Sequence, residues 1–145
     1  MNFSSLSEIA SYIVSDGKGI LAADESNPTC TKRFDSIGVE STEDNRRDYR
    51  ELLFRSEGMK GNIGGVILFD ETIRQTAADG TSLVDVITNQ GSLPGIKVDK
   101  GLQQIGDTEE SLTQGIEGLD SRLKEYYGLG AKFTKWRAVI NIGED

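Results

Sequence analysis

Three short apolar runs of this 145-residue sequence carry charged side chains at or near their ends, where such groups could do chemistry. The runs are GILAADES (19–26), GIKVDK (95–100) and AKFTKWRAVI (131–140). Their charged residues include Asp24, Lys97, Asp99, Lys135 and Arg137. Because side chains alternate along a strand, Lys97 and Asp99 are expected on one face of their run. Lys135 and Arg137 are likewise expected to share a face, with Trp136 pointing away.

Two interpretations of these charges are open. Lysine and arginine inside apolar strands are costly unless they are paired or meet an anionic ligand. Asp24 and Lys97 could therefore simply pair inside a sheet, as structural ion pairs do. Alternatively, the strands could present both groups to a ligand at one edge of the sheet.

Composition narrows the chemistry. With 16 basic and 24 acidic residues the formal charge is −8, which disfavours nucleic acid as a partner. Residues 2–16 lack the basic and apolar regions of a signal peptide. No run reaches the roughly 18 apolar residues of a membrane span. We therefore expect a cytoplasmic protein without a membrane partner. The sequence has no histidine and one cysteine, so catalysis would depend on Lys, Asp, Glu, Arg, Ser and Tyr.

The hydrophobic pattern predicts strands alternating with helices. Short apolar runs near glycines predict strands covered on both faces at 19–24, 63–70, 95–100 and 131–140. Helical spacing predicts helices near 6–14, 41–57, 81–87 and 114–127. Their expected caps are a Ser5–Glu8 capping box, Ser41 or Thr42, Thr81 or Ser82, and Gly128 at the last C-terminus.

This alternation predicts an α/β protein with a parallel sheet, either a doubly wound open sheet or a (β/α)₈ barrel. The loop after the first strand, DESNPTCTKRF, has no glycine, which disfavours a dinucleotide-binding sheet. A flavodoxin-like sheet remains possible from the pattern alone. In either architecture ligands bind at the carboxyl ends of the strands, so the charged residues are expected to converge there.

Other polar residues have ordinary explanations beside functional ones. Lys32 and Arg33 could hold a phosphate or form a solvated loop pair. The segment 45–47, which includes Arg46, reads as a surface face of a helix, and Cys30 reads as an incidental loop residue. Asp70 and Glu71 could bind a metal with Asp24, but nearby lysines would compete with the cation, so no metal site is predicted.

Six collinear motifs identify a family resemblance. They are GKGILAADES, KRF.SIG.E.TE.NRR.YR, IGGVILFDET, GIKVDKG, TQGIEGLD.R and AKFTKWRAVI.IGE. Together, from Gly17 onward, they closely resemble class I fructose-bisphosphate aldolase. The resemblance implies a (β/α)₈ barrel preceded by an N-terminal helix, and a homotetramer. It also implies reversible cleavage of fructose 1,6-bisphosphate into dihydroxyacetone phosphate and glyceraldehyde 3-phosphate, through a lysine Schiff base without metal or cofactor.

The resemblance also assigns roles to residues. Asp24 matches an aspartate beside the Schiff-base lysine, and Lys97 a cationic neighbour that would lower the pKa of that amine. Lys135 matches a lysine that assists proton handling, and Arg137 a substrate contact. Four further residues match positions around the substrate phosphates: Ser26, Lys32, Arg33 and Arg46.

The sequence departs from the family pattern in two ways. Asn27-Pro28-Thr29 replaces Thr-Gly-Ser before the Lys-Arg pair. The family's Schiff-base lysine and catalytic glutamate lie on later strands, beyond Asp145. We therefore expect residues 1–145 to be an incomplete domain, the N-terminal helix and about the first four strand–helix units of the barrel, inactive alone. The alternatives are a non-catalytic half-barrel that binds a sugar phosphate or a partner, and a lyase using Lys97 or Lys135 as its own Schiff-base amine.

Overall fold

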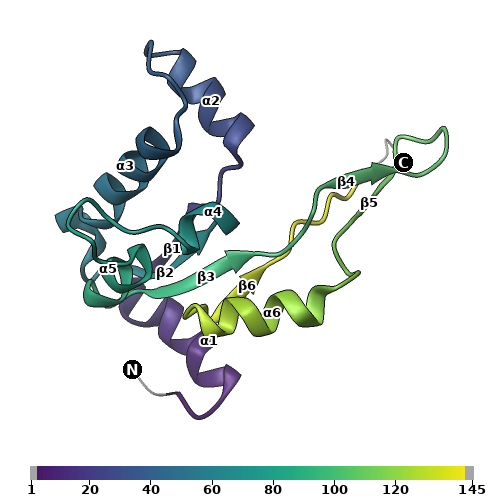
Figure 1. Ribbon diagram of the computed structural model, residues 1–145. Helices are drawn as coiled ribbons and strands as arrows, with labels where there is room; N and C mark the ends of the chain where they lie inside the picture. Colours follow the sequence, from purple (N-terminus) through teal and green to yellow (C-terminus); the bar gives the residue numbers. More distant parts are fainter. Residues whose placement is uncertain (1–2, 143–145) are drawn as a thin grey trace.

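A four-stranded parallel sheet organises the chain in the computed structural model, which describes residues 3–142 (Figure 1). Its strands are β1 (Gly19–Ala23), β2 (Ile63–Leu68), β3 (Leu93–Lys97) and β6 (Phe133–Lys135), in that spatial order. Each strand pairs in parallel with the next, and the order never reverses. A doubly wound sheet would contain such a reversal, so the barrel alternative is the one observed.

The four predicted helices are present, with corrected bounds. They are α1 (Leu6–Val14), α3 (Glu43–Phe54), α5 (Leu83–Asn89) and α6 (Leu119–Gly128). Ser5, Thr42 and Ser82 are the N-caps of the first three, each side chain accepting a backbone N–H three residues on. The capping box is only half formed, because the Glu8 carboxylate accepts bonds from Ser4. Two 3₁₀ turns follow α1 and α3: η1 (Ser15–Gly17) and η2 (Glu57–Met59).

The segment expected as a loop after β1 is a helix. The helix α2 (Asn27–Asp35) begins with Ser26 at the N-cap and Pro28 in its first turn. Proline fits that position because the N–H it lacks would have no partner inside the helix. Cys30 is therefore a helical residue and not a loop residue, and it is fully buried.

Two further predictions about local structure were wrong. The strand expected at 131–140 forms ladder bonds only over Phe133–Lys135, and the helix expected from 114 begins at Leu119. Gly128 is the last helical residue, while Gly130, with φ of 107°, takes the left-handed turn that follows.

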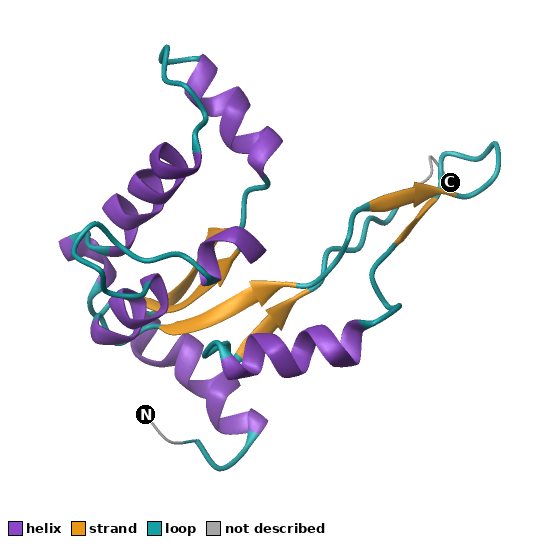
Figure 2. Cartoon of the chain, viewed as in Figure 1, coloured by secondary structure: helices purple, strands orange, loops and turns teal. Residues whose placement is uncertain are grey.

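Three short elements were not anticipated. A one-turn helix, α4 (Asp70–Ile73), follows β2. An antiparallel hairpin, β4 (Leu102–Gln104) and β5 (Ser111–Thr113), projects from the sheet beside the C-terminal end of the described chain (Figures 1 and 2). Thr113 Oγ1 donates to the carbonyl of Arg137, which joins the hairpin to that end.

The hydrophobic core lies between the sheet and its helices. Along the strands, alternate side chains pack against α3 and α5 and are inaccessible to solvent; they are Ala23, Val66, Leu68 and Ile96. Phe54 of α3 and Ile87 of α5 complete this layer. The sheet packs against its helices through the face that carries these residues.

The opposite face of the sheet was expected to be buried, but along β1 it is exposed. Ile20 on this face is 47% exposed, and Ala22 is exposed. The strand register aligns Ala22, Ile67, Gly95 and Phe133 across the sheet. A Cβ on Gly95 would lie 2.3 Å from the Phe133 ring, so glycine is needed for the ring to cover β3. Toward the carboxyl ends, Lys97 and Lys135 are register partners, and Asp24 comes directly after β1.

Candidate functional site

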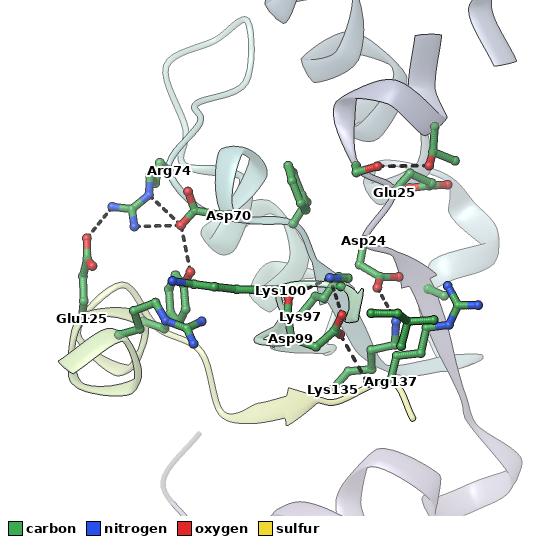
Figure 3. A pocket seen from close by; sticks show the side chains of 18 of the residues that line it. Asp24, Glu25, Asp70, Arg74, Lys97, Asp99, Lys100, Glu125, Lys135 and Arg137 are labelled. Atoms are coloured by element: carbon green, nitrogen blue, oxygen red, sulfur yellow. Dashed lines mark hydrogen bonds and ion pairs between the residues drawn. The ribbon is translucent and has the colours of Figure 1, made fainter. Parts of the chain in front are cut away.

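A cleft of about 1040 Å³ lies over the carboxyl ends of the strands. In Figure 3, side chains from β3, β6, α4 and α6 and from the segment directly after β1 surround it. Six of the predicted site residues line this cleft: Asp24, Ser26, Arg33, Lys97, Lys135 and Arg137. The prediction that charged residues from three strands converge is confirmed.

An ion pair joins the two outermost strands of the sheet across this cleft. Lys135 Nζ at the end of β6 donates to Asp24 Oδ2 at the end of β1, at 2.8 Å. Strands spaced about 4.8 Å apart in a flat sheet would separate β1 from β6 by about 14 Å. The contact therefore depends on the curvature of the sheet, which brings its two edges toward each other on the concave side.

A second ion pair lies on β3 and the segment after it. Lys97 Nζ donates to Asp99 Oδ1 and to the Asp99 carbonyl, both at 2.8 Å. Burial disfavours the charged form of Asp99, but the hydrogen bond and charge of Lys97 outweigh it, and the pKa of Asp99 is lowered. Lys97 is thus paired along its own strand, and Asp24 has Lys135 as its partner, not Lys97 as in the simple ion-pair interpretation.

Arg137 is attached to this pair through its backbone. Its N–H donates to Asp99 Oδ2 at 3.3 Å, while its side chain lines the cleft. Asp99 therefore bonds the Lys97 side chain and the Arg137 backbone, and both cationic side chains line the same cleft.

Hydroxyl groups and an arginine lie beside the end of β1. Ser26 Oγ is 3.1 Å from Thr29 Oγ1, and both residues line the cleft. Arg33 donates to the Glu25 carboxylate and, at 2.8 Å, to the hydroxyl of Tyr49. Its side chain is 53% exposed, so the guanidinium faces solvent as well.

Two predicted phosphate residues are placed elsewhere. Lys32 is exposed on α2 and does not line the cleft. Arg46 is buried and forms a bidentate ion pair with Glu71, at 2.8 Å from Nε and 2.6 Å from Nη2. This hydrogen bond from Arg46 is the largest reason that the pKa of Glu71 is lowered, with burial acting in the opposite direction.

The sequence interpretation missed a buried residue of this network, Arg50. It lies between two carboxylates, 4.0 Å from Glu25 and 3.8 Å from Glu71, and is inaccessible to solvent. The sequence does contain a pattern that indicates this burial: Arg46, Arg50 and Phe54 recur every four residues, which is the spacing of one helix face. All three are buried, so this face of α3 is not the surface face that the segment 45–47 suggested.

The far wall of the cleft carries a separate polar cluster from α4 and α6. Asp70 accepts bonds from Arg74 at 2.8 Å and from the Tyr126 hydroxyl at 3.0 Å, and Arg74 also pairs with Glu125 at 2.6 Å. Burial opposes ionisation of Asp70, yet the bonds from Arg74 and Tyr126 prevail and its pKa is lowered. Asp70 and Glu71 are thus both bound to arginines. Residues 3–142 contain no cluster of three or more acidic, cysteine or histidine side chains arranged for a metal.

Within the part of the chain that the structure describes, no helix has the length and apolar character needed to span a membrane.

Comparison with known proteins places these features in a family. The family described as fructose-bisphosphate aldolase class-I matches residues 5–145. A probable class 1 fructose-bisphosphate aldolase of Xanthomonas axonopodis pv. citri is 54% identical over 146 residues, covering 100% of this chain and 44% of the relative. The chloroplastic fructose-bisphosphate aldolase 1 of Chlamydomonas reinhardtii is 54% identical over 138 residues, covering 94% of this chain and 37% of the relative.

A solved structure agrees with the fold. Fructose-bisphosphate aldolase from Plasmodium falciparum, crystallised with TRAP and a small-molecule inhibitor, superposes with a TM-score of 0.88 at 52% identity. The match covers 91% of this chain and 38% of that protein, so the chain spans less than half the length of these relatives. The four parallel strands in barrel order are the corresponding part of a TIM-barrel fold. The chain belongs to the class I fructose-bisphosphate aldolase family.

Proposed function

We propose that the complete protein containing this chain is a Schiff-base aldolase that reversibly cleaves fructose 1,6-bisphosphate in glycolysis. The observation that carries this proposal is the convergence of Asp24, Lys97 and Lys135 in one cleft, in a chain of this family. The products would be dihydroxyacetone phosphate and glyceraldehyde 3-phosphate, and neither a metal nor a cofactor takes part.

The residues of this chain would prepare the site for an amine supplied by a later strand. Lys97, held by Asp99, places a positive charge beside that amine and lowers the pKa of the amine, which leaves more of it free to attack the ketone. Asp24 and Lys135, in hydrogen-bond contact at 2.8 Å, form a donor–acceptor pair that moves protons at the carbon–carbon bond being cleaved.

The substrate phosphates would be held at two places in the cleft. Ser26, Thr29 and the exposed guanidinium of Arg33 offer donors beside β1, and Arg137 offers a cation beside β6. Lys32 and Arg46 remain predictions from the family resemblance. Arg46 would have to leave Glu71 to reach a phosphate, whereas Lys32 needs only to swing from the surface of α2.

Three broader properties belong to the same proposal. The complete protein works as a homotetramer in the cytoplasm, and residues 1–145 form the N-terminal half of its barrel domain. The 145-residue chain on its own is inactive, because the amine that forms the Schiff base is expected outside it.

Borohydride trapping tests the reaction. With dihydroxyacetone phosphate, reduction should attach the triose phosphate to the complete protein at a lysine beyond residue 145, found by peptide mass spectrometry. The isolated chain should stay unmodified, and samples without borohydride provide the background. Trapping at Lys97 or Lys135 of the isolated chain would replace the proposal with a lyase that uses its own amine. Binding of fructose 1,6-bisphosphate by the 145-residue chain itself, with no adduct formed, would favour the alternative of a non-catalytic half-barrel.

A further inference from the structure

Arg50 bonds the peptide group before Asp24 and the peptide group after Glu25, at the two ends of the Asp24-Glu25 segment. Its Nη2 donates to the carbonyl of Glu25 at 2.6 Å, and its Nε donates to the carbonyl of Ala23 at 3.4 Å. Ala23 is the last residue of β1, so Asp24 and Glu25 lie beyond the strand. The guanidinium thus fixes the backbone where the sheet no longer does.

The position of Arg50 is itself strongly constrained. The helix α3, capped by Thr42, directs one face of Arg46, Arg50 and Phe54 inward. The carboxylates of Glu25 and Glu71 on either side compensate the buried positive charge of Arg50. Cys30 Sγ of α2 lies 3.6 Å from Nη2, while Nη1 is buried without a hydrogen-bond partner among residues 3–142 and has only the nearby charge of Glu71. A buried guanidinium enclosed in this way has little freedom to change its conformation.

We propose that Arg50 is a positioning residue that orients Asp24 toward Lys135 by clamping the Ala23 and Glu25 carbonyls. With both ends of the Asp24-Glu25 segment held, the backbone at Asp24 cannot turn freely, and such a turn would move its side chain away from the 2.8 Å contact with Lys135 Nζ. This inference rests on the proposed function for its effect on catalysis. Its geometric part concerns only the Asp24–Lys135 pair and does not depend on which reaction the cleft performs.

The shape of the guanidinium explains why arginine occupies this position. Two of its N–H groups point at carbonyls two residues apart, from a rigid plane. A lysine ammonium at the same position is a compact charge on a flexible stem and would hold one carbonyl at a time. Arg50→Lys therefore keeps the buried charge and removes the clamp, whereas Arg50→Met removes both.

Steady-state kinetics of the complete protein test the catalytic part. Arg50→Lys should lower kcat for fructose 1,6-bisphosphate about tenfold and change KM less than about twofold, because misplacement of a reacting group by about 1 Å costs up to 100-fold in rate. In an Asp24→Asn background the same substitution should have almost no further effect, since effects that act through one residue do not add. Equal losses of kcat in both backgrounds would overturn the proposal.

Phe54→Leu is the matched control for packing. Phe54 is as buried as Arg50 and lies one turn further along the same face of α3, but it belongs to the hydrophobic core. We expect Phe54→Leu to lower Tm while kcat, measured well below the melting transition, stays at the wild-type value. A fall in kcat as large as that of Arg50→Lys would assign the effect to packing of α3 and contradict the positioning role.

Competitive acetylation tests the geometric part without any activity. Acetic anhydride labelling, read by peptide mass spectrometry, should modify Lys135 several-fold faster in Arg50→Lys than in the wild type, because its partner is released. Lys97 is the internal control, since Asp99 holds it independently of Arg50. If Lys135 and Lys97 change together, or neither changes, the proposal is wrong. If the complete protein has no aldolase activity, the proposed function fails, and this labelling still decides the role of Arg50.

Discussion

The chain holds buried positive charge in two different ways, and the two regions lie on either side of the end of β1. In the cleft, Lys97 and Lys135 each pair with one carboxylate, and their side chains are 19% and 31% exposed. Between α3 and the ends of β1 and β2, Arg46 and Arg50 are buried among Glu25, Glu71 and main-chain carbonyls. We call the first set the lysine pairs and the second the arginine network.

The two regions differ in whether their cations can exchange partners. A lysine held by one partner and partly exposed can exchange that partner for a substrate atom or a proton. An arginine buried beside carboxylates cannot leave them without unpairing buried charge. The family resemblance alone placed Arg46 with the phosphate-binding residues, whereas the tertiary structure places it in the arginine network.

Removing the carboxylate of a lysine pair should have the largest effect on catalysis. Asp24→Asn in the complete protein should lower kcat by about 10²- to 10⁴-fold, since proton transfer by a positioned group contributes about that much. Its Tm should change little, because the Lys135–Asp24 pair is partly exposed and Lys135 can be solvated. Coupled-enzyme kinetics and thermal melts measure both. A wild-type kcat would remove Asp24 from the mechanism.

Removing a carboxylate of the arginine network should lower stability more and kcat less than Asp24→Asn does. Glu71→Gln leaves Arg46 and Arg50 without a charged neighbour that both of them share. The free energy of unfolding should fall by about 3 kcal/mol, while kcat of the folded protein falls far less than in Asp24→Asn. Urea denaturation of the complete protein gives the first quantity. A loss of kcat as large as that of Asp24→Asn would mean that the two regions are not distinct.

The same substitution predicts a pH dependence. The pKa of Glu71 lies below its ordinary 4.5 in the folded protein, so the unfolded chain binds a proton there first as the pH falls. The stabilising contribution of Glu71 is therefore complete above about pH 4.5 and is lost as the pH falls through the lowered pKa. The stability difference between wild type and Glu71→Gln should shrink over that acidic window. A difference that stays constant down to acid pH would show that the pair does not depend on the charge of Glu71.

Removing an exposed ion pair should have the smallest effect on stability. Lys124 and Asp120 pair one turn apart on α6, at 2.7 Å, with side chains 77% and 82% exposed. Lys124→Gln should shift Tm by no more than about 2 °C, because water and salt screen such pairs. Differential scanning calorimetry at low and high salt checks this. A shift as large as that of Glu71→Gln would mean that ion-pair geometry outweighs burial in this protein.

Local sequence patterns predicted helix starts well where a single capping residue determines where the helix begins. Ser5, the pair Ser41 or Thr42, and the pair Thr81 or Ser82 marked three helix starts, because a side-chain oxygen satisfies the free N–H groups there; the structure uses Ser5, Thr42 and Ser82. The missed helix α2 shows where such signals weaken. Its segment NPTCTKRFD has no strong apolar face, and its Ser26 N-cap makes no side-chain cap bond. Its two buried residues, Cys30 and Phe34, are too few to show a helical period.

The sequence by itself determined which residues could do chemistry and that three strands would bring them to one edge, because alternation sets which face each side chain occupies. Only the tertiary structure decided their partners: Asp24 with Lys135, Lys97 with Asp99, and Arg46 with Glu71. The reason is distance. An ion pair forms within about 4 Å, and which of several opposite charges comes that close depends on the curvature of the sheet and the placement of α3, both of which are properties of the whole fold.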